Sequence, residues 1–340
     1  MKKKFLCLFL GIWLCLSFSL PLYAFDGSIN ADDDAELVTP TLEMTTIPTG
    51  AAAVAHNLNT NQTYYYRMNG YILSSDDGDL YEPGWMPETH SVDAVIGDDN
   101  RELVSNTQVA PFSAIAWIKV KYSDESFGYS TATMISPNVA LTSAHCLYDE
   151  DNGIWPISIE VYPALNDIFG CPGTPFGYAT AREVVISLPF FENKSGAQWD
   201  WGVIRLNSNI GTHSGFLGLH YFDMTISDLS VMISGYPKDL NNNWATQNQY
   251  KHNGLIYYDE SSQTTLSNYG TYETRYFTYI IDTEVGQSGS PILCYWEGSY
   301  QIIGIHSGKG DASGNVYYNN NGFGLTSEVF QFLVTYKNNS

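Results

Sequence analysis

The sequence predicts an all-β protein made of antiparallel sheets, arranged as sandwiches or barrels. Its composition favours strands and turns over helices, because 25 of the 340 residues are Tyr and Thr, Ser, Asn and Gly are abundant. Short runs of β-branched and aromatic residues recur, and Gly, Pro, Asn and Ser turns separate them. Helical patterns of 10–15 residues do not alternate with these runs, which argues against a parallel α/β fold.

Length and charge narrow the class of protein. A chain of 340 residues can form one large domain or two modest ones with a substantial core. The formal charge of −21 argues against nucleic acid and anionic membranes as partners, since few cations are available to neutralise phosphates. This acidity suits a soluble, secreted protein.

The first 24 residues have the pattern of a secretory signal peptide. Lys2, Lys3 and Lys4 precede an apolar run at 5–20, and Ala24 offers a cleavage site. An uncleaved membrane anchor is the alternative, but the run is shorter than the ~20 residues that span a bilayer. We therefore expect export, with no membrane association once the signal is removed.

Residues 25–94 differ in character from the rest of the chain. Asp32–Asp34 and a second acidic stretch at 76–79 lie among Thr, Ser, Asn and Pro, and the apolar residues have little periodicity. The pattern predicts a separate, partly ordered segment that serves as a propeptide. A flexible linker or a small adapter region is the alternative.

From residue 95 onward the sequence takes on the texture of a β protein. The expected strands are at 112–119, 131–135, 157–162, 201–206, 230–234, 274–281, 292–296 and 301–306. A single helix is expected at 325–336, capped by Thr326 or Ser327, with Val329, Phe330, Leu333 and Tyr336 on one face. The stretch 207–218, rich in Asn, Ser and Gly, is the expected hinge between two halves.

Three short stretches carry residues suited to nucleophilic catalysis. His145 ends an apolar run at 141–146, Asp200 opens a strand-like segment at 199–206, and Ser288 lies between glycines at 286–291. Glycines permit a tight turn and a close approach of substrate backbone. Singly, these residues have ordinary interpretations as a core histidine, a turn-capping aspartate and a loop serine. Together, in the order His, Asp, Ser, they indicate a hydrolytic triad.

The chain resembles the chymotrypsin-like (trypsin-like) serine proteases, and among them the bacterial glutamyl endopeptidase branch. The matching pieces are Val-Ile-Gly-Asp-Asp-Asn-Arg at 95–101, Thr-Ser-Ala-His-Cys at 142–146, Asp-Trp-Gly-Val-Ile at 200–204, Ser-Gly-Tyr-Pro at 234–237, Asp-Thr at 282–283, Gly-Gln-Ser-Gly-Ser-Pro at 286–291 and Gly-Ile-His at 304–306. A Gly-x-Ser-x-Gly hydrolase elbow does not fit, because position 290 is Ser and the order of the triad differs.

This resemblance implies two six-stranded antiparallel β-barrels, formed by 95–215 and 216–340, with a C-terminal helix on the outside. Ser288 would be the nucleophile, His145 its general base and Asp200 the group that orients the imidazole. The backbone N–H groups of Gly286 and Ser288 would form the oxyanion hole. Protein or peptide substrates are implied, and we expect a monomer that needs no cofactor.

The resemblance also assigns the substrate pocket to Thr283 and His306, with a contribution from Val95. A threonine hydroxyl and an imidazole can both donate to a carboxylate, so cleavage after Glu, and less readily after Asp, is expected. Asp282 leaves an alternative open, because an aspartate six residues before the nucleophile pairs with Lys or Arg in trypsin-like enzymes. A protease scaffold that only binds its partner is a further alternative.

Activation is expected to differ from that of digestive zymogens. Those enzymes pair a new N-terminal ammonium with an aspartate just before the nucleophile, whereas this chain has the uncharged Gln287 there. In members of the glutamyl branch the new amino group helps to bind the substrate carboxylate, and Val95 aligns with that terminus. Cleavage after Asp93 or Ala94 would start the mature chain at Ala94 or Val95.

The cysteines depart from the family pattern. Cys7 and Cys15 belong to the signal, which leaves Cys146, Cys171 and Cys294. The usual partner position of Cys146 is Ser130, and that of Cys294 is near Val231, so disulfides are doubtful. No His/Cys cluster has the spacing of a metal site, although calcium on surface carboxylates remains an open possibility.

Overall fold

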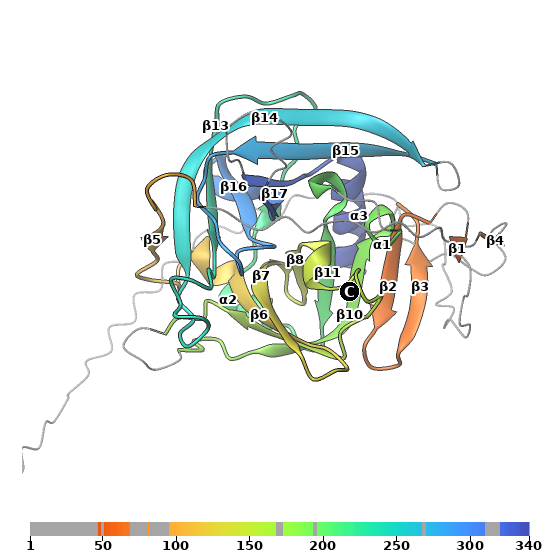
Figure 1. Ribbon diagram of the computed structural model, residues 1–340, viewed down its shortest axis with the longest axis horizontal. Coiled ribbons are helices and arrows are strands. Elements are labelled where there is room, and N and C mark those ends of the chain that lie inside the picture. The colour runs from red at the N-terminus through yellow and green to blue at the C-terminus, as the bar shows by residue number, and fades with distance from the viewer. Residues whose placement is uncertain are drawn as a thin grey trace, which may run out of the picture. The chain divides into compact units, whose positions relative to one another are not determined.

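The computed structural model describes residues 47–48, 51–68, 80–81, 95–167, 173–192, 196–266, 270–309 and 320–339. Within them, strands dominate and form two barrels, with one long helix at the C-terminal end (Figure 1). The predicted signal peptide and the predicted cut before Val95 lie outside the described residues. The helices of the described part are too short or too polar to traverse a lipid bilayer.

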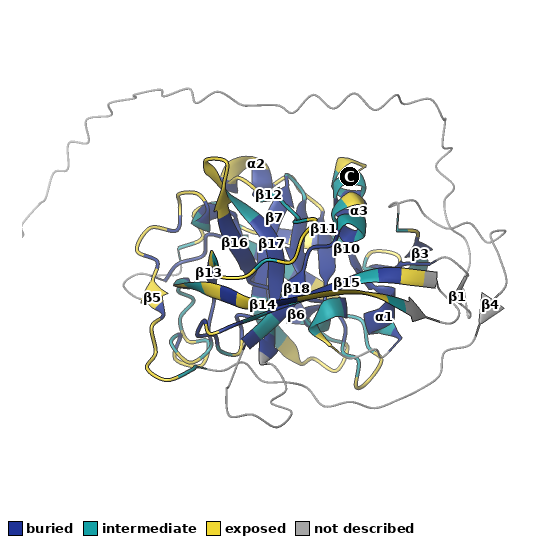
Figure 2. Cartoon of the chain, turned by 90° about the horizontal axis from the view of Figure 1, so that it is seen from above, coloured by how far each residue is buried: buried dark blue, intermediate teal, exposed yellow. Residues whose placement is uncertain are grey.

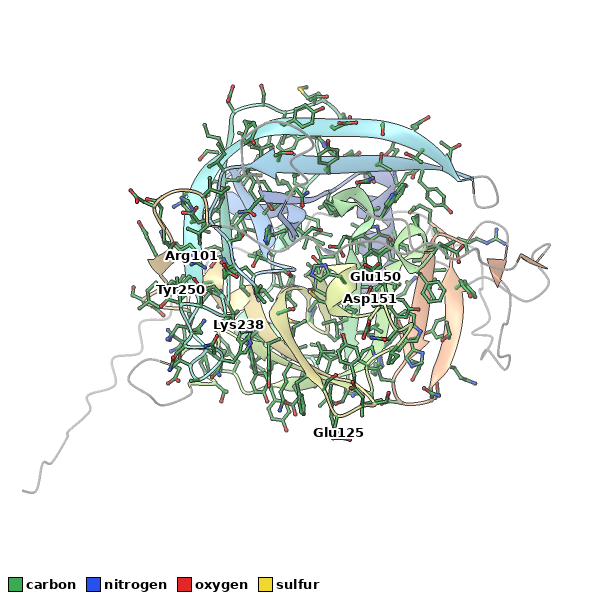
Figure 3. The ribbon with its side chains drawn as sticks, viewed as in Figure 1. Arg101, Glu125, Glu150, Asp151, Lys238 and Tyr250 are labelled. Carbon is green, nitrogen blue, oxygen red and sulfur yellow. The ribbon has the colours of Figure 1, made fainter. Side chains whose placement is uncertain are left out.

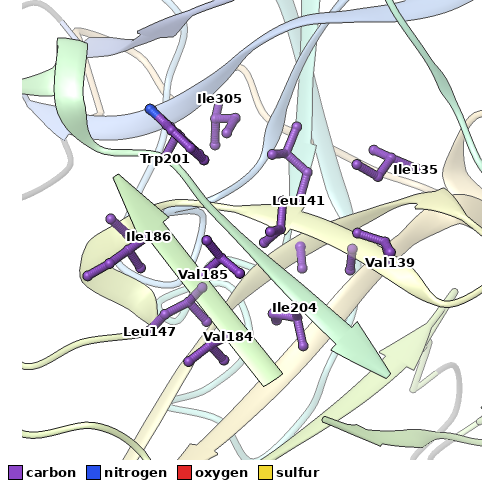
Figure 4. Packing of buried hydrophobic residues seen from close by; sticks show 14 of the residues in the cluster. Ile135, Val139, Leu141, Leu147, Val184, Val185, Ile186, Trp201, Ile204 and Ile305 are labelled. Atoms are coloured by element: carbon purple, nitrogen blue, oxygen red, sulfur yellow. The ribbon is translucent and has the colours of Figure 1, made fainter. Parts of the chain in front are cut away.

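The first barrel is a closed, antiparallel sheet of six strands. They are β6 (Ile115–Lys121), β7 (Phe127–Ser136), β8 (Val139–Thr142), β9 (Ser158–Pro163), β10 (Ala179–Ser187) and β11 (Gly202–Leu206). Their order is β11-β8-β7-β6-β9-β10, and pairing of β10 with β11 closes the barrel. Branched side chains such as Leu141, Val184 and Ile204 are buried against its sheet (Figure 4).

The second barrel is built in the same way. Its strands are β13 (Leu229–Gly235), β14 (Tyr250–Leu266), β15 (Gly270–Tyr279), β16 (Pro291–Trp296), β17 (Ser299–Lys309) and β18 (Asn320–Gly324). The order is β17-β16-β13-β14-β15-β18, and β17 pairs with β18 to close it. Both predicted six-stranded barrels are thereby confirmed.

Several further elements are short. They are β1 (Ile47–Pro48), β4 (Leu80–Tyr81), β5 (Glu102–Leu103), β12 (Gly218–Leu219), α1 (Leu188–Phe191), α2 (Gly211–Ser214) and the 3₁₀ turns η1 (Phe112–Ala114), η2 (Ala144–Cys146) and η4 (Ala197–Trp199). The predicted hinge at 207–218 contains α2 and leads into β12, which pairs with β17 of the second barrel. The strand expected to begin at residue 112 begins at Ile115, because 112–114 forms η1.

The predicted C-terminal helix is α3 (Ser327–Asn338), and the Thr326 side chain caps it by accepting from the N–H of Val329. Its buried face differs from the prediction by one residue. Val329, Phe332, Leu333 and Tyr336 are buried, whereas Phe330 is half-buried. Phe332 and Leu333 lie three and four residues after Val329, so Phe332 replaces Phe330 in the packed stripe.

The segment expected to be only partly ordered holds a well-packed hairpin. Its strands are β2 (Ala53–Asn57) and β3 (Gln62–Tyr66), and β2 pairs with β10, so the hairpin extends the sheet of the first barrel. Residues 51–55 are fully buried (Figure 2). The small Ala residues hid this strand from sequence analysis, because apolar bulk and alternation are both weak there.

Candidate active site

His145 and Asp200 come together because the strands next to them are paired. His145 lies in η2, three residues after β8 ends at Thr142, and Asp200 lies two residues before β11 begins at Gly202. Thr142 and Gly202 are direct partners in the β8–β11 ladder. The antiparallel register therefore places both side chains at the same end of the first barrel.

The two side chains form a tight hydrogen-bonded pair. The Asp200 Oδ2 atom lies 2.7 Å from His145 Nδ1, and Oδ1 accepts the His145 backbone N–H at 3.0 Å. This double contact fixes the imidazole relative to the carboxylate and directs its Nε2 edge away from Asp200. It is the arrangement that a general base needs from an orienting carboxylate.

Ser307 is a further partner of Asp200, and sequence analysis did not identify it. Its hydroxyl donates to Asp200 Oδ2 at 2.5 Å from the second barrel. Ser307 follows His306 on β17, and neighbouring residues of a strand point to opposite faces. Because His306 is buried in the second barrel, Ser307 faces the other way, toward Asp200, a relation that only the assembled barrels reveal.

Burial and charge act in opposite directions on this pair. Burial alone would lower the pKa of His145, but the neighbouring Asp200 carboxylate outweighs it and raises the pKa well above its usual value. Burial would likewise raise the pKa of Asp200, yet the imidazole and the hydrogen bonds from His145 and Ser307 lower it. The pair therefore favours a charged aspartate and a histidine that gains a proton readily.

The loop that carries Ser288 is shaped by its glycines. Gly286 and Gly289 have φ values of 96° and 81°, in the left-handed region that favours glycine. A Cβ on Gly289 would lie 2.1 Å from Thr142 Oγ1, and one on Gly286 would lie 2.5 Å from the Tyr236 carbonyl oxygen. The two glycines thus allow the loop to fold back against the stretch that leads to His145.

Thr131 of β7 fastens this loop to the first barrel. Its hydroxyl donates to the Gly286 carbonyl at 2.8 Å, and its backbone N–H donates to the Ser288 carbonyl at 3.0 Å. Ser143 and Gly289 both donate to the carbonyl of His306, at 2.9 Å each. The loops of His145 and Ser288 are therefore held together across the two barrels, and the half-buried Ser288 lies at their junction.

Within the described residues, the backbone N–H groups of Gly286 and Ser288 donate to no protein acceptor. Two N–H groups left open beside a serine are what a developing oxyanion requires. Among the described residues, His145 is hydrogen-bonded to Asp200 but not to Ser288. Contacts between base and nucleophile are often long in ligand-free proteases and shorten when substrate binds.

Thr283 and His306 are both fully buried in the second barrel. His306 Nδ1 lies 2.7 Å from the Tyr279 hydroxyl, which also donates to the carbonyl of Asn321. The Thr283 hydroxyl has no hydrogen-bond partner among the described residues. A buried hydroxyl without a partner is costly, so a polar ligand group at this position would relieve the cost.

Asp282 points away from Thr283 toward the N-terminal stretch 96–100. Its Oδ1 accepts the Ile96 N–H at 2.8 Å, and its Oδ2 accepts the Asn100 N–H at 2.8 Å and the Asn100 side-chain amide at 3.3 Å. The Asp282 N–H donates to His252 Nδ1. Both carboxylate oxygens are thus occupied by the protein itself.

Arg101, which Figure 3 labels, extends this attachment to the loop that carries Ser288. Its buried guanidinium pairs with Asp99 and Asp239, and Nη1 donates to Gln287 Oε1 at 3.3 Å. The same Gln287 oxygen accepts the N–H of Glu284, which stabilises the turn just before Ser288. The uncharged Gln287 therefore receives an internal guanidinium, and Val95, at the start of this stretch, is half-buried.

Cys146 and Cys294 are buried and free. Val231 lies directly opposite Cys294 in the β13–β16 ladder, so the position expected for a partner cysteine holds an apolar residue. Cys171 lies outside the described residues. In the part of the chain that the structure describes, no group of three or more His, Cys, Asp or Glu is placed to hold a metal ion.

Comparisons with known proteins agree with this geometry. The model of the trypsin family matches residues 104–323. A glutamyl endopeptidase of Bacillus licheniformis is 30% identical over 256 residues, covering 74% of this chain and 71% of that protein. An extracellular metalloprotease of Bacillus subtilis is 27% identical over 255 residues, with 74% and 72% covered.

Solved structures give the same picture. A Glu endopeptidase in complex with MPD superimposes with a TM-score of 0.58 at 29% identity, covering 72% of this chain and 99% of that one. The protease Anisep from Arthrobacter nicotinovorans has a TM-score of 0.50 at 16% identity, with 70% and 98% covered, and supports the fold alone.

Proposed function

The chain belongs to the trypsin family of serine proteases, and from this premise we propose that it is a secreted glutamyl endopeptidase made as a precursor. It acts on protein substrates as a trypsin-like serine endopeptidase.

In the proposed mechanism, His145 takes the proton of the Ser288 hydroxyl while Ser288 attacks the scissile carbonyl. Asp200 holds the imidazole through Nδ1 and stabilises the imidazolium that forms. The N–H groups of Gly286 and Ser288 then donate to the oxyanion of the tetrahedral intermediate. Thr131 and Arg101 contribute by fixing the loop that carries these groups.

The orientation of Asp282 is the observation that carries the proposed specificity. Lysine or arginine in the pocket would need a carboxylate turned toward it, but the Asp282 oxygens already accept from Ile96 and Asn100. The groups that we assign to the substrate are the buried Thr283 hydroxyl, which lacks a partner among the described residues, and the His306 imidazole, whose Nδ1 contacts the Tyr279 hydroxyl. Both suit a carboxylate, which supports cleavage after Glu, and less readily after Asp.

Precursor processing is supported by the position of the 95–100 stretch. Ile96 and Asn100 lie against Asp282, next to Thr283, so a new amino group at Ala94 or Val95 would start close to the pocket. A positive charge there would favour a substrate carboxylate. We propose export through the signal at 1–24 and action as a monomer.

The decisive experiment is digestion of a peptide library by the processed protein, with identification of the residue before each cut. Cuts after Glu are expected, and Thr283→Val should weaken them by raising KM about 10-fold or more, since the carboxylate loses a donor. Cuts after Lys or Arg would refute the proposed carboxylate pocket but would still support a serine protease. A folded protein that neither cuts nor reacts with a fluorophosphonate would favour the binding-scaffold alternative.

A further inference from the structure

The hairpin β2–β3 occupies a strand edge of the first barrel. Residues 183–186 of β10 pair with β11 on one side, and residues 183–187 pair with residues 53–57 of β2 on the other. Two further backbone bonds close the ladder at its ends, from Leu188 N to Ala52 O at 3.0 Å and from Leu58 N to Arg182 O at 2.9 Å. Without the hairpin, this edge would present unpaired backbone groups.

The contacts of the hairpin reach beyond β10. The Tyr272 hydroxyl of the second barrel donates to the Ala51 carbonyl at 2.7 Å. The Tyr66 ring packs edge-on against Phe332 and Tyr336 of α3, at centroid distances of 5.9 and 5.6 Å. The residues at 51–66 thus touch both barrels and the C-terminal helix.

The two ends of the hairpin are as buried as the barrel core itself. Residues 51–55 are 0–3% exposed, and Tyr65 and Tyr66 are 4% and 6% exposed. They belong to one continuous apolar cluster with barrel residues such as Ile186. A strand that merely covered a surface would keep one face in water, whereas residues 51–55 are buried on both faces.

A buried polar network also depends on the hairpin. Glu183 of β10 accepts the Tyr66 hydroxyl at 3.4 Å and the Tyr336 hydroxyl, and Arg205 lies 3.5 Å away. Burial raises the pKa of Glu183, with Arg205 opposing it. Removal of the hairpin would leave this carboxyl and the faces of Phe332 and Tyr336 open to solvent.

We propose that residues 51–66 stay seated on β10 after the chain is cut before Val95, so that the mature enzyme is a non-covalent complex of two pieces of one chain. This inference rests on the proposed precursor. The surface is the β10 edge with the adjoining side of α3, and its occupant is this chain's own hairpin. The hairpin then serves as a permanent part of the fold, and the segment between it and Val95 is the part that processing opens.

The test begins with the full chain carrying Ser288→Ala, so that the cut does not depend on its own activity. An added glutamyl-specific protease cuts at Glu88 or Asp93, between hairpin and barrels, and mass spectrometry under denaturing conditions identifies the pieces. Under native size-exclusion chromatography, the piece containing 51–66 should elute with the catalytic piece at a 1:1 ratio. Separate elution of the two, with the catalytic piece still folded by circular dichroism, would overturn the proposal.

Variants make the result specific to the hairpin. Ala55→Asp places a carboxylate at a fully buried position of β2, and we expect the cut complex to fall apart. The matched control Asn59→Asp adds the same charge at an exposed position of the hairpin turn and should elute as the parent does. Should Ala55→Asp not fold, Val54→Ala keeps the fold, and its hairpin should dissociate about 10-fold faster. An unchanged dissociation rate would overturn the proposal.

Failure of this inference is separable from failure of the proposed function. Fluorophosphonate labelling of the wild-type chain reports the activated Ser288. A complex that persists in an unlabelled protein would refute the catalytic proposal alone. A labelled, folded enzyme that loses the hairpin once cut would refute only the proposal that the hairpin stays bound.

Discussion

Two pieces of chain on either side of the predicted cut are attached to the barrels by opposite means. The hairpin β2–β3 is held by a backbone ladder and by apolar burial against β10 and α3. The stretch 96–101 is held by charge, through Asp282 and through the Arg101 contacts with Asp239 and Gln287. The first attachment lies on the body of the fold, whereas the second ends on the loop of the nucleophile.

The difference implies a division of roles. A change in the hairpin should alter stability and leave each catalytic step intact, because its described contacts are with β10, the loop after His145, β15 and α3. A change in the charged stretch should alter catalysis, because Gln287 directly precedes Ser288.

A purely catalytic change sets the reference. Asp200→Asn should lower kcat by about 10⁴ with little loss of stability, since the imidazole loses its orienting carboxylate. The acid limb of the pH–rate profile should also move to lower pH. Asp200 raises the pKa of His145 against the effect of burial, so its removal lets that pKa fall, and the neutral base persists to lower pH.

Rate profiles of the wild type and of Asp200→Asn between pH 5 and 9 provide the measurement. As the pH is lowered, wild-type activity should begin to fall before the pH reaches 6.5, the ordinary pKa of histidine, because the His145 pKa is raised. An acid limb in the variant at the same or a higher pH would contradict the assignment of Asp200. Ser307→Ala should shift the limb slightly in the opposite direction, to higher pH, because Asp200 then loses a donor that shares its negative charge.

Arg101→Met is the largest expected change outside the triad. It removes the donor to Gln287 and leaves Asp99 and Asp239 without their cation, so the turn before Ser288 loosens. We expect kcat to fall about 10²–10³-fold, the range for loss of an oxyanion donor. KM should change less than kcat.

Lys251→Met is the matched control for Arg101→Met, because Lys251 pairs with the neighbouring Glu102 at the surface. Its kinetics should equal those of the wild type within about 2-fold. Equal effects of the two variants on kcat would show that the charged stretch does not act through the nucleophile loop. The division of roles would then fail on its catalytic side.

Much of this picture follows from the sequence, because the strong signals are local. The apolar runs of β6, β7, β13 and β16 exceed a turn's length and are bounded by turn residues, so their existence could be predicted. The order of His145, Asp200 and Ser288 likewise stands in the sequence. β14 was missed because its second half, from Tyr257 to Thr264, has few apolar residues on either face and is rich in Asp, Glu, Ser, Gln and Thr.

The relations that the sequence did not reveal are contacts between distant segments. Ser307 reaches Asp200 only after the two barrels assemble, and Thr131 touches both Gly286 and Ser288 across the same junction. The orientation of Asp282 was undecided in sequence, because a pocket carboxylate and a structural one have the same local pattern. The backbone N–H groups that settle its orientation come from a segment 186 residues away.

Val54→Ala tests the stability side of the comparison. Val54 is fully buried opposite Ile186, so the loss of two methyl groups should cost about 1–3 kcal/mol. In a chain of this size that lowers the thermal midpoint by about 2–4 °C per kcal/mol. The kcat of the folded enzyme should stay within about 2-fold, and a loss comparable to that of Arg101→Met would erase the distinction between the two attachments.

His56 offers the smallest and sharpest test, because it makes the hairpin sensitive to pH. Its ring stacks on Trp155 in the loop after His145, at 5.2 Å and 5°, and burial lowers its pKa, although a hydrogen bond with Asn61 opposes this. The unfolded chain therefore takes up a proton near pH 6.5 that the folded chain resists, so stability is lost as the pH falls below that value. His56→Phe keeps the stacked ring but cannot titrate.

Thermal midpoints of the wild type and of His56→Phe at pH 8 and pH 5 carry the measurement. Loss of the hydrogen bond to Thr63 should lower the thermal midpoint of the variant equally at both pH values. The fall of the thermal midpoint from pH 8 to pH 5 should be smaller in the variant than in the wild type. Identical declines would remove His56 as a titrating group of the hairpin. A smaller decline accompanied by slower loss of the hairpin from the cut complex at pH 5 would place the pH sensitivity in the apolar attachment, where the charged stretch at 96–101 has no part.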